Sequence, residues 1–271
     1  MLIRLNNLRW WAKLECASRE KVVLVASLFV FFLAWTCSWA ILEADRSLHF
    51  DVLEAYAWGR EFQLGYDKHG PFWSWVAGAW FSLFPNTNTC FVLLEASNAT
   101  LGLLGAWRLN GLFVTGRMRD AAVLLLLVTP FYTFQAYKYN ANTIFISLWP
   151  WTLFFFVRSL DKGRKWDAAL FGVFAAALLL SKYYAVVLLL TCALALPFHE
   201  QWRRYILSPL PWIAGVMFAA LALPHLIWTI KAGAPTVAYA ISKTGKGWLA
   251  PIIHGGQFLI WVVLSQSGVL L

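Results

Sequence analysis

Residues whose types suit acid–base and phosphate chemistry gather in one polar segment, residues 48–75. Asp51 and Glu54 are three residues apart, so on a helix their carboxylates share a face. Lys68 and His69 follow in the same segment. A carboxylate can take a proton from a hydroxyl group, and cations can hold a phosphate on which negative charge develops. The segment therefore combines groups that can activate a hydroxyl with groups that can hold a phosphate.

The acidic pair belongs to a predicted amphipathic helix. Trp58 and Glu61 continue the face of Asp51, at positions i+7 and i+10. The opposite face carries three apolar residues, Phe50, Leu53 and Ala57. We expect this helix to lie along a membrane surface with its acidic face toward water. The alternative is a solvated helix face that carries no chemistry.

A turn rich in glycine and charge links this helix to the next apolar run. Its Gly and Pro residues supply the bend. Its sequence is Gly65-Tyr66-Asp67-Lys68-His69-Gly70-Pro71. We expect Lys68 and His69 to lie at the depth of lipid headgroups, close to the acidic helix. Alternatively, Lys68 only extends its ammonium group along an apolar surface to reach the headgroups.

Other polar residues lie within or between later apolar runs. Lys182 lies between two runs, which costs free energy unless its ammonium group meets water or a counter-charge. It is a functional candidate, although anchoring at the interface explains it nearly as well. Glu95, inside an apolar run, is a candidate on the same grounds but has no evident partner. For His225, core packing is the favoured role. Polar residues at other run ends are Tyr139, Asn142 and Tyr183.

The composition indicates an all-α bundle of transmembrane helices. Of the 271 residues, 61% are hydrophobic and 13% are charged, whereas a soluble domain has roughly 45–50% apolar and about 25% charged residues. The excess has to face lipid, and we expect one membrane domain over residues 1–271. The net charge of +9 is ascribed to basic cytoplasmic loops, so no nucleic acid partner is expected. The four cysteines lack CxxC spacing and fit neither a disulfide framework nor a zinc site.

Apolar runs predict about eight or nine spans, although some runs are shorter than the roughly 17–25 residues of a spanning helix. The runs cover residues 22–42, 71–84, 89–107, 120–136, 141–157, 168–180, 183–197, 209–229 and 252–271. The first run lacks an obvious A-x-A cleavage site and is interpreted as a retained signal-anchor helix. The chain ends inside the last run, at Leu271, so we expect it to be incomplete at the C-terminus.

Basic residues in short loops predict the orientation in the membrane. The N-terminal segment is assigned to the cytoplasm, so residues 43–70 form the first periplasmic loop. The basic residues that mark the cytoplasmic side are Arg4, Arg9, Lys13, Arg19 and Lys21, then Arg108, Arg117 and Arg119, then Arg158, Lys162, Arg164 and Lys165, and last Arg203 and Arg204. The outward-facing links are residues 137–142, 181–184 and 230–251.

The stretch 71–108 conflicts with this orientation, because two apolar runs lie where an odd number of crossings is required. Residues 71–84 are short for a span and could form a partial or interfacial helix. The two runs could also form one bent element. In the third interpretation both runs cross, and the basic residues that begin at Arg108 break the charge rule.

The order of these features resembles the polytopic GT-C glycosyltransferases that use lipid phosphosugars. The closest resemblance is to glycosyltransferase family 39, with bacterial relatives of protein O-mannosyltransferases, aminoarabinose transferases and rhizobial galacturonosyltransferases. Such proteins show an acidic pair after the first helix and a Gly-Tyr-x-x-His-Pro-Pro-like turn before the second. The residues that carry the resemblance are Asp51 and Glu54, Leu64 to Phe72 with Gly70 in place of a usual Pro, Tyr139 to Thr143, and Leu180 to Tyr183.

The resemblance implies a polyprenyl-phosphate sugar as the donor and an active site on the periplasmic face of a bacterial inner membrane. It implies that Asp51 is the base that deprotonates an acceptor hydroxyl, which attacks the anomeric carbon with inversion. Glu54 would orient a sugar, and Lys68, His69 and, as a weaker candidate, Lys182 would hold the departing phosphate. Further candidates for donor binding are Asp67, Tyr139, Asn142 and Tyr183.

The resemblance leaves the acceptor open as a glycan, a lipid or a protein. No cofactor or metal is expected, and a divalent ion held by the acidic pair is the less favoured alternative. Two other functions remain as hypotheses. One is a transporter or flippase of a lipid-linked precursor, for which Glu95 is the main supporting feature. The other is a non-catalytic fragment of such an enzyme, which the position of the chain end at Leu271 suggests.

Overall fold

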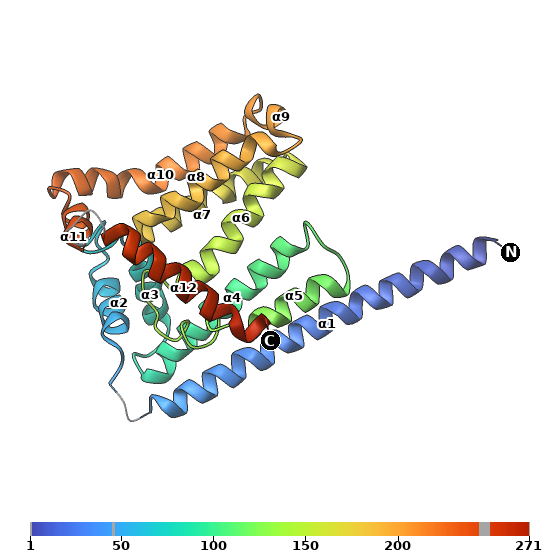
Figure 1. The fold of residues 1–271 in the computed structure, drawn as a ribbon, viewed down its shortest axis with the longest axis horizontal. Coiled ribbons are helices and arrows are strands. Elements are labelled where there is room, and N and C mark those ends of the chain that lie inside the picture. Colours follow the sequence, from blue (N-terminus) through green and yellow to red (C-terminus); the bar gives the residue numbers. More distant parts are fainter. Residues whose placement is uncertain (1, 45–46, 244–249, 271) are drawn as a thin grey trace.

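Figure 1 shows the computed structural model of the chain, in which the regular structure of the described residues is helical. It describes residues 2–44, 47–243 and 250–270, with side chains for residues 22–44, 47–239, 241–242 and 253–264. Leu271, on which the prediction of an incomplete C-terminus rests, lies outside these ranges. The side chains of the N-terminal basic residues also lie outside them. The α-helices are α1 (Leu2–Leu42), α2 (Phe50–Glu61), α3 (Phe72–Leu83), α4 (Asn88–Asn110), α5 (Arg117–Leu127), α6 (Phe145–Lys162), α7 (Lys165–Ser181), α8 (Val186–Ala195), α9 (Trp202–Ile206), α10 (Leu210–Lys231), α11 (Pro235–Lys243) and α12 (Ala250–Leu270). Two short 3₁₀ helices flank α8, η1 (Tyr183–Ala185) and η2 (Leu196–Phe198).

Three described helices are long and apolar enough to cross a membrane: the Val22–Leu42 part of α1, α4 and α10. Shorter apolar helices occur at Tyr183–Phe198 and Ile253–Leu264. Each apolar run of the sequence contains a helix, and the all-α membrane bundle is confirmed. Many large side chains on the long helices are exposed and apolar, such as Phe29 on α1 and Trp212 on α10. Exposed apolar side chains suit a surface that faces lipid.

The run 120–136 differs from the predicted continuous helix. Helix α5 ends at Leu127, and residues 128–144 form turns and bends up to the start of α6. Pro130 lacks a backbone N–H and disfavours helical geometry in the residue before it, which ends the helix. The hydroxyl of Thr129 also donates to the carbonyl of Leu126 at 2.9 Å, closing the last turn. This irregular stretch brings Tyr139, Ala141 and Thr143 into the interior of the bundle.

Helix α3 is too short to cross the bilayer. Its 12 residues extend about 18 Å, against about 30 Å of hydrocarbon. It packs against α2 through Gly59 and Gly78, where a Cβ on Gly59 would lie 2.6 Å from the backbone nitrogen of Gly78. Of the three interpretations, a partial helix fits best. One crossing by α4 then separates residue 70 from Arg108, which agrees with the charge rule.

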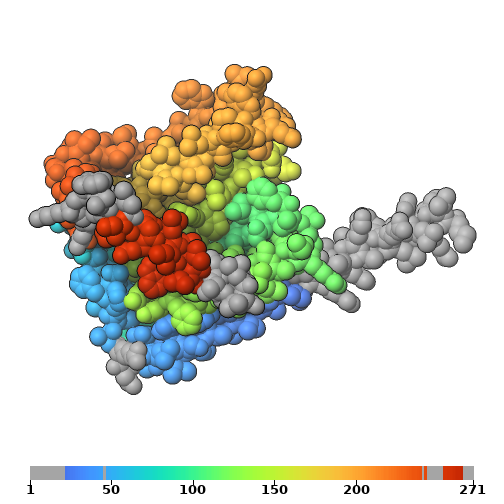
Figure 2. All heavy atoms as spheres, viewed as in Figure 1, coloured from blue at the N-terminus to red at the C-terminus, as the bar shows by residue number. Residues whose placement is uncertain are grey.

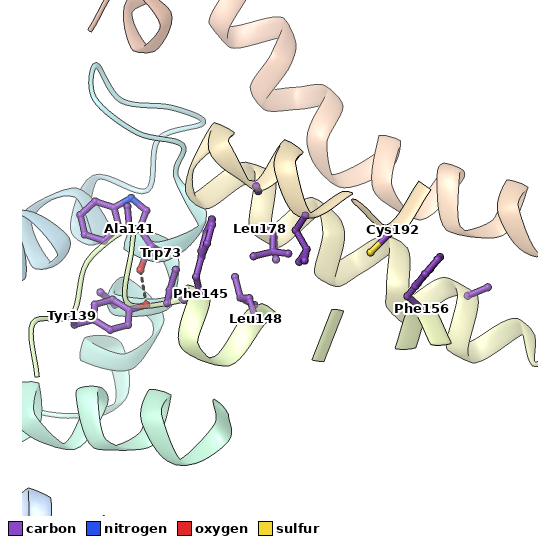
Figure 3. Close-up of a cluster of buried hydrophobic side chains, with 14 of the residues drawn as sticks. Trp73, Tyr139, Ala141, Phe145, Leu148, Phe156, Leu178 and Cys192 are labelled. Atoms are coloured by element: carbon purple, nitrogen blue, oxygen red, sulfur yellow. Dashed lines mark hydrogen bonds between the residues drawn. The ribbon is translucent and has the colours of Figure 1, made fainter. Parts of the chain in front are cut away.

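A buried core joins α3, α6, α7 and the turn before α6. It includes Trp73, Tyr139, Phe145 and Leu178, which Figure 3 shows packed at the junction of these elements. Trp73 and Leu178 are fully buried. The hydroxyl of Tyr139 donates to the carbonyl of Trp73 at 2.9 Å. Because lipid provides little hydrophobic drive between helices, such close packing and hydrogen bonding hold the bundle together.

The two polar ends of the bundle are separated by the length of α4. Figure 1 shows α2, α3 and α11 gathered at one end of the bundle and α9 at the other. The 23 residues of α4 extend about 35 Å between these ends. In Figure 2, α12 lies on the viewed face, and its described side chains, 253–264, are exposed.

Candidate active site

Helix α2 begins where a histidine caps it. The Nδ1 atom of His49 accepts a hydrogen bond from the backbone N–H of Asp51 at 3.2 Å, satisfying a donor that a helix start leaves unpaired. Val52 and Ala55 are buried against the neighbouring elements, while Phe50 and Leu53 are exposed as the predicted apolar face requires. The helix therefore presents the face of its acidic pair in one fixed direction.

That acidic face does not point uniformly toward water, which corrects the sequence-based expectation. The side chain of Glu54 is only 10% exposed, whereas that of Asp51 is 39% exposed. Glu54 turns inward because the following turn returns along α2 and delivers Lys68 to it. Asp51, one helical turn earlier, has a side chain that remains partly exposed.

Lys68 and Glu54 form an ion pair, with Nζ 2.5 Å from Oε1. The hydrogen bond that Lys68 donates to Glu54 raises the pKa of Lys68 above its usual value, and the negative charges of Glu54 and Asp51 act in the same direction. The ammonium group also lies 5.0 Å from the ring centroid of Phe50. Lys68 is therefore a fixed positive charge beside the acidic helix.

His69 is neutral at pH 7, which changes the role it can take. Burial, together with the positive charges of Lys182 and Lys68, lowers the pKa of His69 to about 4, against the opposing charge of Asp51. Its ring lies 6.2 Å from that of Trp73, centroid to centroid. His69 can thus offer a neutral N–H group to a phosphate, but not a second fixed charge.

Asp51 is linked to Lys182 through two asparagines of the turn before α6. The Nδ2 group of Asn140 donates to Oδ2 of Asp51 at 3.0 Å. The Oδ1 atom of Asn140 accepts from the backbone N–H groups of Asn142 and Thr143, at 2.8 and 3.0 Å. Nζ of Lys182 donates to Oδ1 of Asn142 at 2.6 Å. Three segments far apart in sequence therefore meet in one network.

Burial lowers the pKa of Lys182, and the charge of Asp51 partly offsets this effect. We use the name Asp51 cluster for the residues joined here: Asp51, Glu54, Lys68, His69, Asn140, Asn142 and Lys182. Asn140 was not among the sequence-based candidates, although it lies within the motif that contains Tyr139 and Asn142. Its direct hydrogen bond to Asp51 is visible only in the folded chain.

Buried polar groups of α4 and α6 hold the turn that carries these asparagines. Oε1 of Glu95 accepts from the backbone N–H of Tyr139 at 3.2 Å, so Glu95 has a partner after all. Nδ2 of Asn98 donates to the carbonyl of Thr143 at 2.8 Å, and Ser147 donates to Oδ1 of Asn98 at 2.6 Å. These bonds fix the turn at both of its ends.

The structure places two predicted candidates away from the polar face of the cluster. Tyr139 is 1% exposed, with its hydroxyl bonded to Trp73 in the core. The hydroxyl of Tyr183 lies 2.9 Å from Nε2 of His225, whose Nδ1 lies 2.7 Å from the carbonyl of Leu64. Since a carbonyl only accepts, Nδ1 of His225 carries the proton and Nε2 accepts from Tyr183. The buried His225 therefore has the core role expected of it.

The turn that carries Lys68 is also held by α11, a helix that the sequence did not indicate. The hydroxyl of Thr236 donates to the carbonyl of Tyr66 at 2.8 Å. The ring of Tyr239 lies 6.1 Å from that of His69, centroid to centroid. Asp67, a predicted candidate for donor binding, is exposed on the same turn. The helix after α10 thus contacts the turn at Tyr66 and His69.

Gly70 lets the same turn approach α7. A Cβ at this position would lie 2.6 Å from the carbonyl carbon of Leu180, so any larger residue would push the turn away from the end of α7. The proline that is usual here would add further atoms at the same point. Gly70 therefore tightens the contact that brings Lys68 and Lys182 to the same place.

A cavity of about 210 Å³ lies between the start of α2 and α4. Glu43, His49, Glu95 and Tyr137 are among the residues that line it. Among the residues that the structure describes, no three His, Cys, Asp or Glu side chains come together as a possible metal site. The cavity is lined by His49 and Val52, which lie close to Asp51 in sequence, but not by Asp51 or Glu54 themselves.

Comparison with known families agrees with this arrangement. The family model of dolichyl-phosphate-mannose-protein mannosyltransferases matches residues 68–228, more than half of the chain. The match begins at Lys68 and includes Asn140, Asn142 and Lys182, while Asp51 and Glu54 precede it. A search of curated proteins found no match. The chain belongs to the dolichyl-phosphate-mannose-protein mannosyltransferase family, and is thus a membrane glycosyltransferase of the GT-C type that uses polyprenyl-phosphate sugars.

Proposed function

We propose that the protein transfers a sugar from a polyprenyl-phosphate carrier to an acceptor hydroxyl, with inversion, at the periplasmic face of a bacterial inner membrane. The observation that supports this proposal most is the meeting of Asp51 with Lys68 and Lys182 across three distant segments. Asp51 can accept the proton that an attacking hydroxyl loses, and the two nearby cations can stabilise the negative charge that develops on the departing phosphate.

Asp51 is the proposed base. Its carboxylate is partly exposed and is held at Oδ2 by Asn140. It accepts the proton of the acceptor hydroxyl while that oxygen forms a bond to the anomeric carbon. The bond from this carbon to the phosphate oxygen breaks, and its electron pair leaves with the lipid phosphate. Attack opposite the leaving phosphate inverts the configuration of the sugar.

Lys68 and Lys182 are proposed to stabilise the departing phosphate. Fixed cations stabilise negative charge that develops in the transition state without the cost of reorienting solvent. In this proposal Glu54 positions the ammonium group of Lys68 through their ion pair. Neutral His69 contributes an N–H donor, which binds phosphate without adding charge.

The proposed orientation of the protein in the membrane rests on basic residues at the end of the bundle opposite the Asp51 cluster. Arg108, Arg119 and Arg158 lie together near the far end of α4, and basic residues favour the cytoplasmic side. The Asp51 cluster, at the start of α4, would then face the periplasm. Bacterial lipid-linked sugars that have been moved across the membrane would meet it there, together with a glycan, lipid or protein acceptor.

The test is transfer of labelled sugar from polyprenyl-phosphate mannose by the purified full chain. Asp51→Asn keeps the shape of the side chain but removes the base, so transfer should fall by about 10²–10⁴-fold. Glu61→Gln is the matched control, because Glu61 is an exposed carboxylate on the same helix. Transfer by Asp51→Asn at the rate of the unmodified protein would exclude Asp51 as the base.

Transport of a lipid-linked precursor is less well supported. Transporters place ionisable groups near the bilayer midplane, and Glu95 was the main feature in favour of this function. Its bond to the backbone of Tyr139 gives Glu95 a structural role in holding the turn. Release of free sugar or sugar transfer by purified protein in detergent, where transport cannot be observed, separates the two functions.

A further inference from the structure

A second polar hollow lies at the end of α4 opposite the Asp51 cluster. Its volume is about 270 Å³, and aromatic walls from Trp107 and Phe154 bound it. We call it the basic pocket because five cationic side chains line it: Arg108, Arg119, Arg158, Lys162 and Arg164. They come from the end of α4, the start of α5, the end of α6 and the link to α7. Four separate parts of the chain thus contribute positively charged side chains to the lining of the basic pocket.

Two carboxylates beside the pocket offset only part of this charge. Nε of Arg119 lies 3.6 Å from Oδ1 of Asp120, and Nε of Arg158 lies 3.3 Å from Oδ1 of Asp167. Asp120 also accepts a hydrogen bond from Nε1 of Trp107 at 3.0 Å. Among the side chains that the structure describes, five cations against these two carboxylates leave an excess of positive charge around a concave space. Arginine side chains in such an arrangement match the oxygens of a phosphate group.

The surroundings of the basic pocket indicate that the phosphate belongs to a lipid. Three large apolar side chains in the segments that line the pocket are strongly exposed: Phe113, Met118 and Trp166. Exposed apolar side chains next to cations suit a molecule with an anionic head and acyl chains. Aromatic residues are also typical of the interface between lipid and water.

We propose that the basic pocket binds the headgroup phosphate of an anionic phospholipid, in the leaflet at the end of the bundle opposite the Asp51 cluster. The charge rule for membrane loops accounts for basic residues on this side, but not for their convergence on one hollow from four segments. Basic pockets between transmembrane helices are suited to anionic headgroups. The proposal does not depend on the proposed sugar transfer.

The test measures lipid binding to the purified full chain in detergent by native mass spectrometry. The probes are dioleoylphosphatidylglycerol, neutral dioleoylphosphatidylcholine and inorganic phosphate. The variant Arg108→Gln/Lys162→Gln removes two exposed cations of the pocket and spares Arg158, which pairs with buried Asp167. Arg203→Gln/Lys165→Gln is the matched control, because it removes one Arg and one Lys at the same end but outside the pocket.

The anionic lipid is expected to bind the unmodified protein at least tenfold more tightly than the neutral lipid. At roughly fivefold for each charge, the pocket variant should weaken this binding by about 25-fold, and the control by less than twofold. Equal weakening in both variants would overturn the pocket in favour of general surface charge. Equal affinity for both lipids, or displacement of the lipid by inorganic phosphate at similar concentration, would overturn the lipid as the ligand.

Discussion

The two polar ends of the molecule hold their cations in different ways. In the Asp51 cluster, Lys68 donates a hydrogen bond to Glu54, and Lys182 donates one to Asn142. An oxygen atom from another segment therefore fixes the position of each ammonium group. In the basic pocket, five cations surround a hollow beside two carboxylates. The first arrangement has both signs of charge in fixed geometry, as bond-making and bond-breaking require. The second has an excess of one sign, which suits binding.

The comparison is tested most strongly by removing one cation from the Asp51 cluster. Lys68→Gln keeps a donor for Glu54 but removes the charge, and the rate of transfer should fall by about 10²–10³-fold. The measurement is kcat for sugar transfer in phosphatidylcholine vesicles. The pocket variant Arg108→Gln/Lys162→Gln should keep its kcat within about threefold under the same conditions, on the scale of a weakly coupled site. If both variants lose activity equally, the two ends do not have separate roles.

A smaller effect on sugar transfer is expected from a substitution that moves the turn carrying Lys68 but keeps its charged side chains. Gly70→Ala places a Cβ against Leu180 and should destabilise the fold by about 1–3 kcal/mol, as overpacking does. Transfer should fall with it, because Lys68 shifts away from Lys182. Gly215→Ala on α10 is the control, since nothing lies within 4 Å of the added Cβ. Thermal unfolding in detergent and transfer rates provide the measurements, and equal behaviour of the two variants would contradict the tight contact.

The smallest expected effect is a pH dependence of stability that comes from His69. Its pKa is about 4 in the folded chain and about 6.5 when unfolded, so the unfolded chain binds more protons between these values. Stability from the neutral imidazole is present above pH 6.5 and is lost as the pH falls toward 4. The melting temperature of His69→Gln should therefore decline less than that of the unmodified protein between pH 7 and pH 4.5. Identical declines would show that His69 is not held neutral.

Much of the Asp51 cluster could be predicted from the sequence because its members occur in order in short motifs. Asp51 and Glu54 share a helix face, and Lys68 follows in the turn that a glycine and a proline define. The roles within residues 139–143 could not be predicted. There burial alternates, so that Tyr139 and Ala141 point into the core while Asn140 and Asn142 stay nearer the surface. This alternation depends on contacts with α4, which are distant in sequence.

The helices were predicted better than their lengths. The apolar runs gave every long helix, since hydrophobic side chains are needed wherever the chain faces lipid or core. The short run 71–84 already left a partial helix open as one interpretation, and α3 is such a helix. The runs did not reveal that the run 120–136 breaks after Leu127, because turns buried in the protein can be as apolar as helices. The basic residues lie at helix ends and in the links between helices, as the sequence indicates, and their assignment to the cytoplasmic side stays a prediction. Their meeting in one pocket follows from how α4, α5 and α6 pack.

The contact between Gly59 and Gly78 restricts how this protein can vary. The atoms that a Cβ would strike belong to the backbone, including the nitrogen of Gly78 and the carbonyl oxygen of Ser74. No change of side chain at the facing position can therefore make room. A substitution at either glycine has no partner change that restores the fit, so these two positions should stay fixed together through sequence divergence even though neither one carries a functional group.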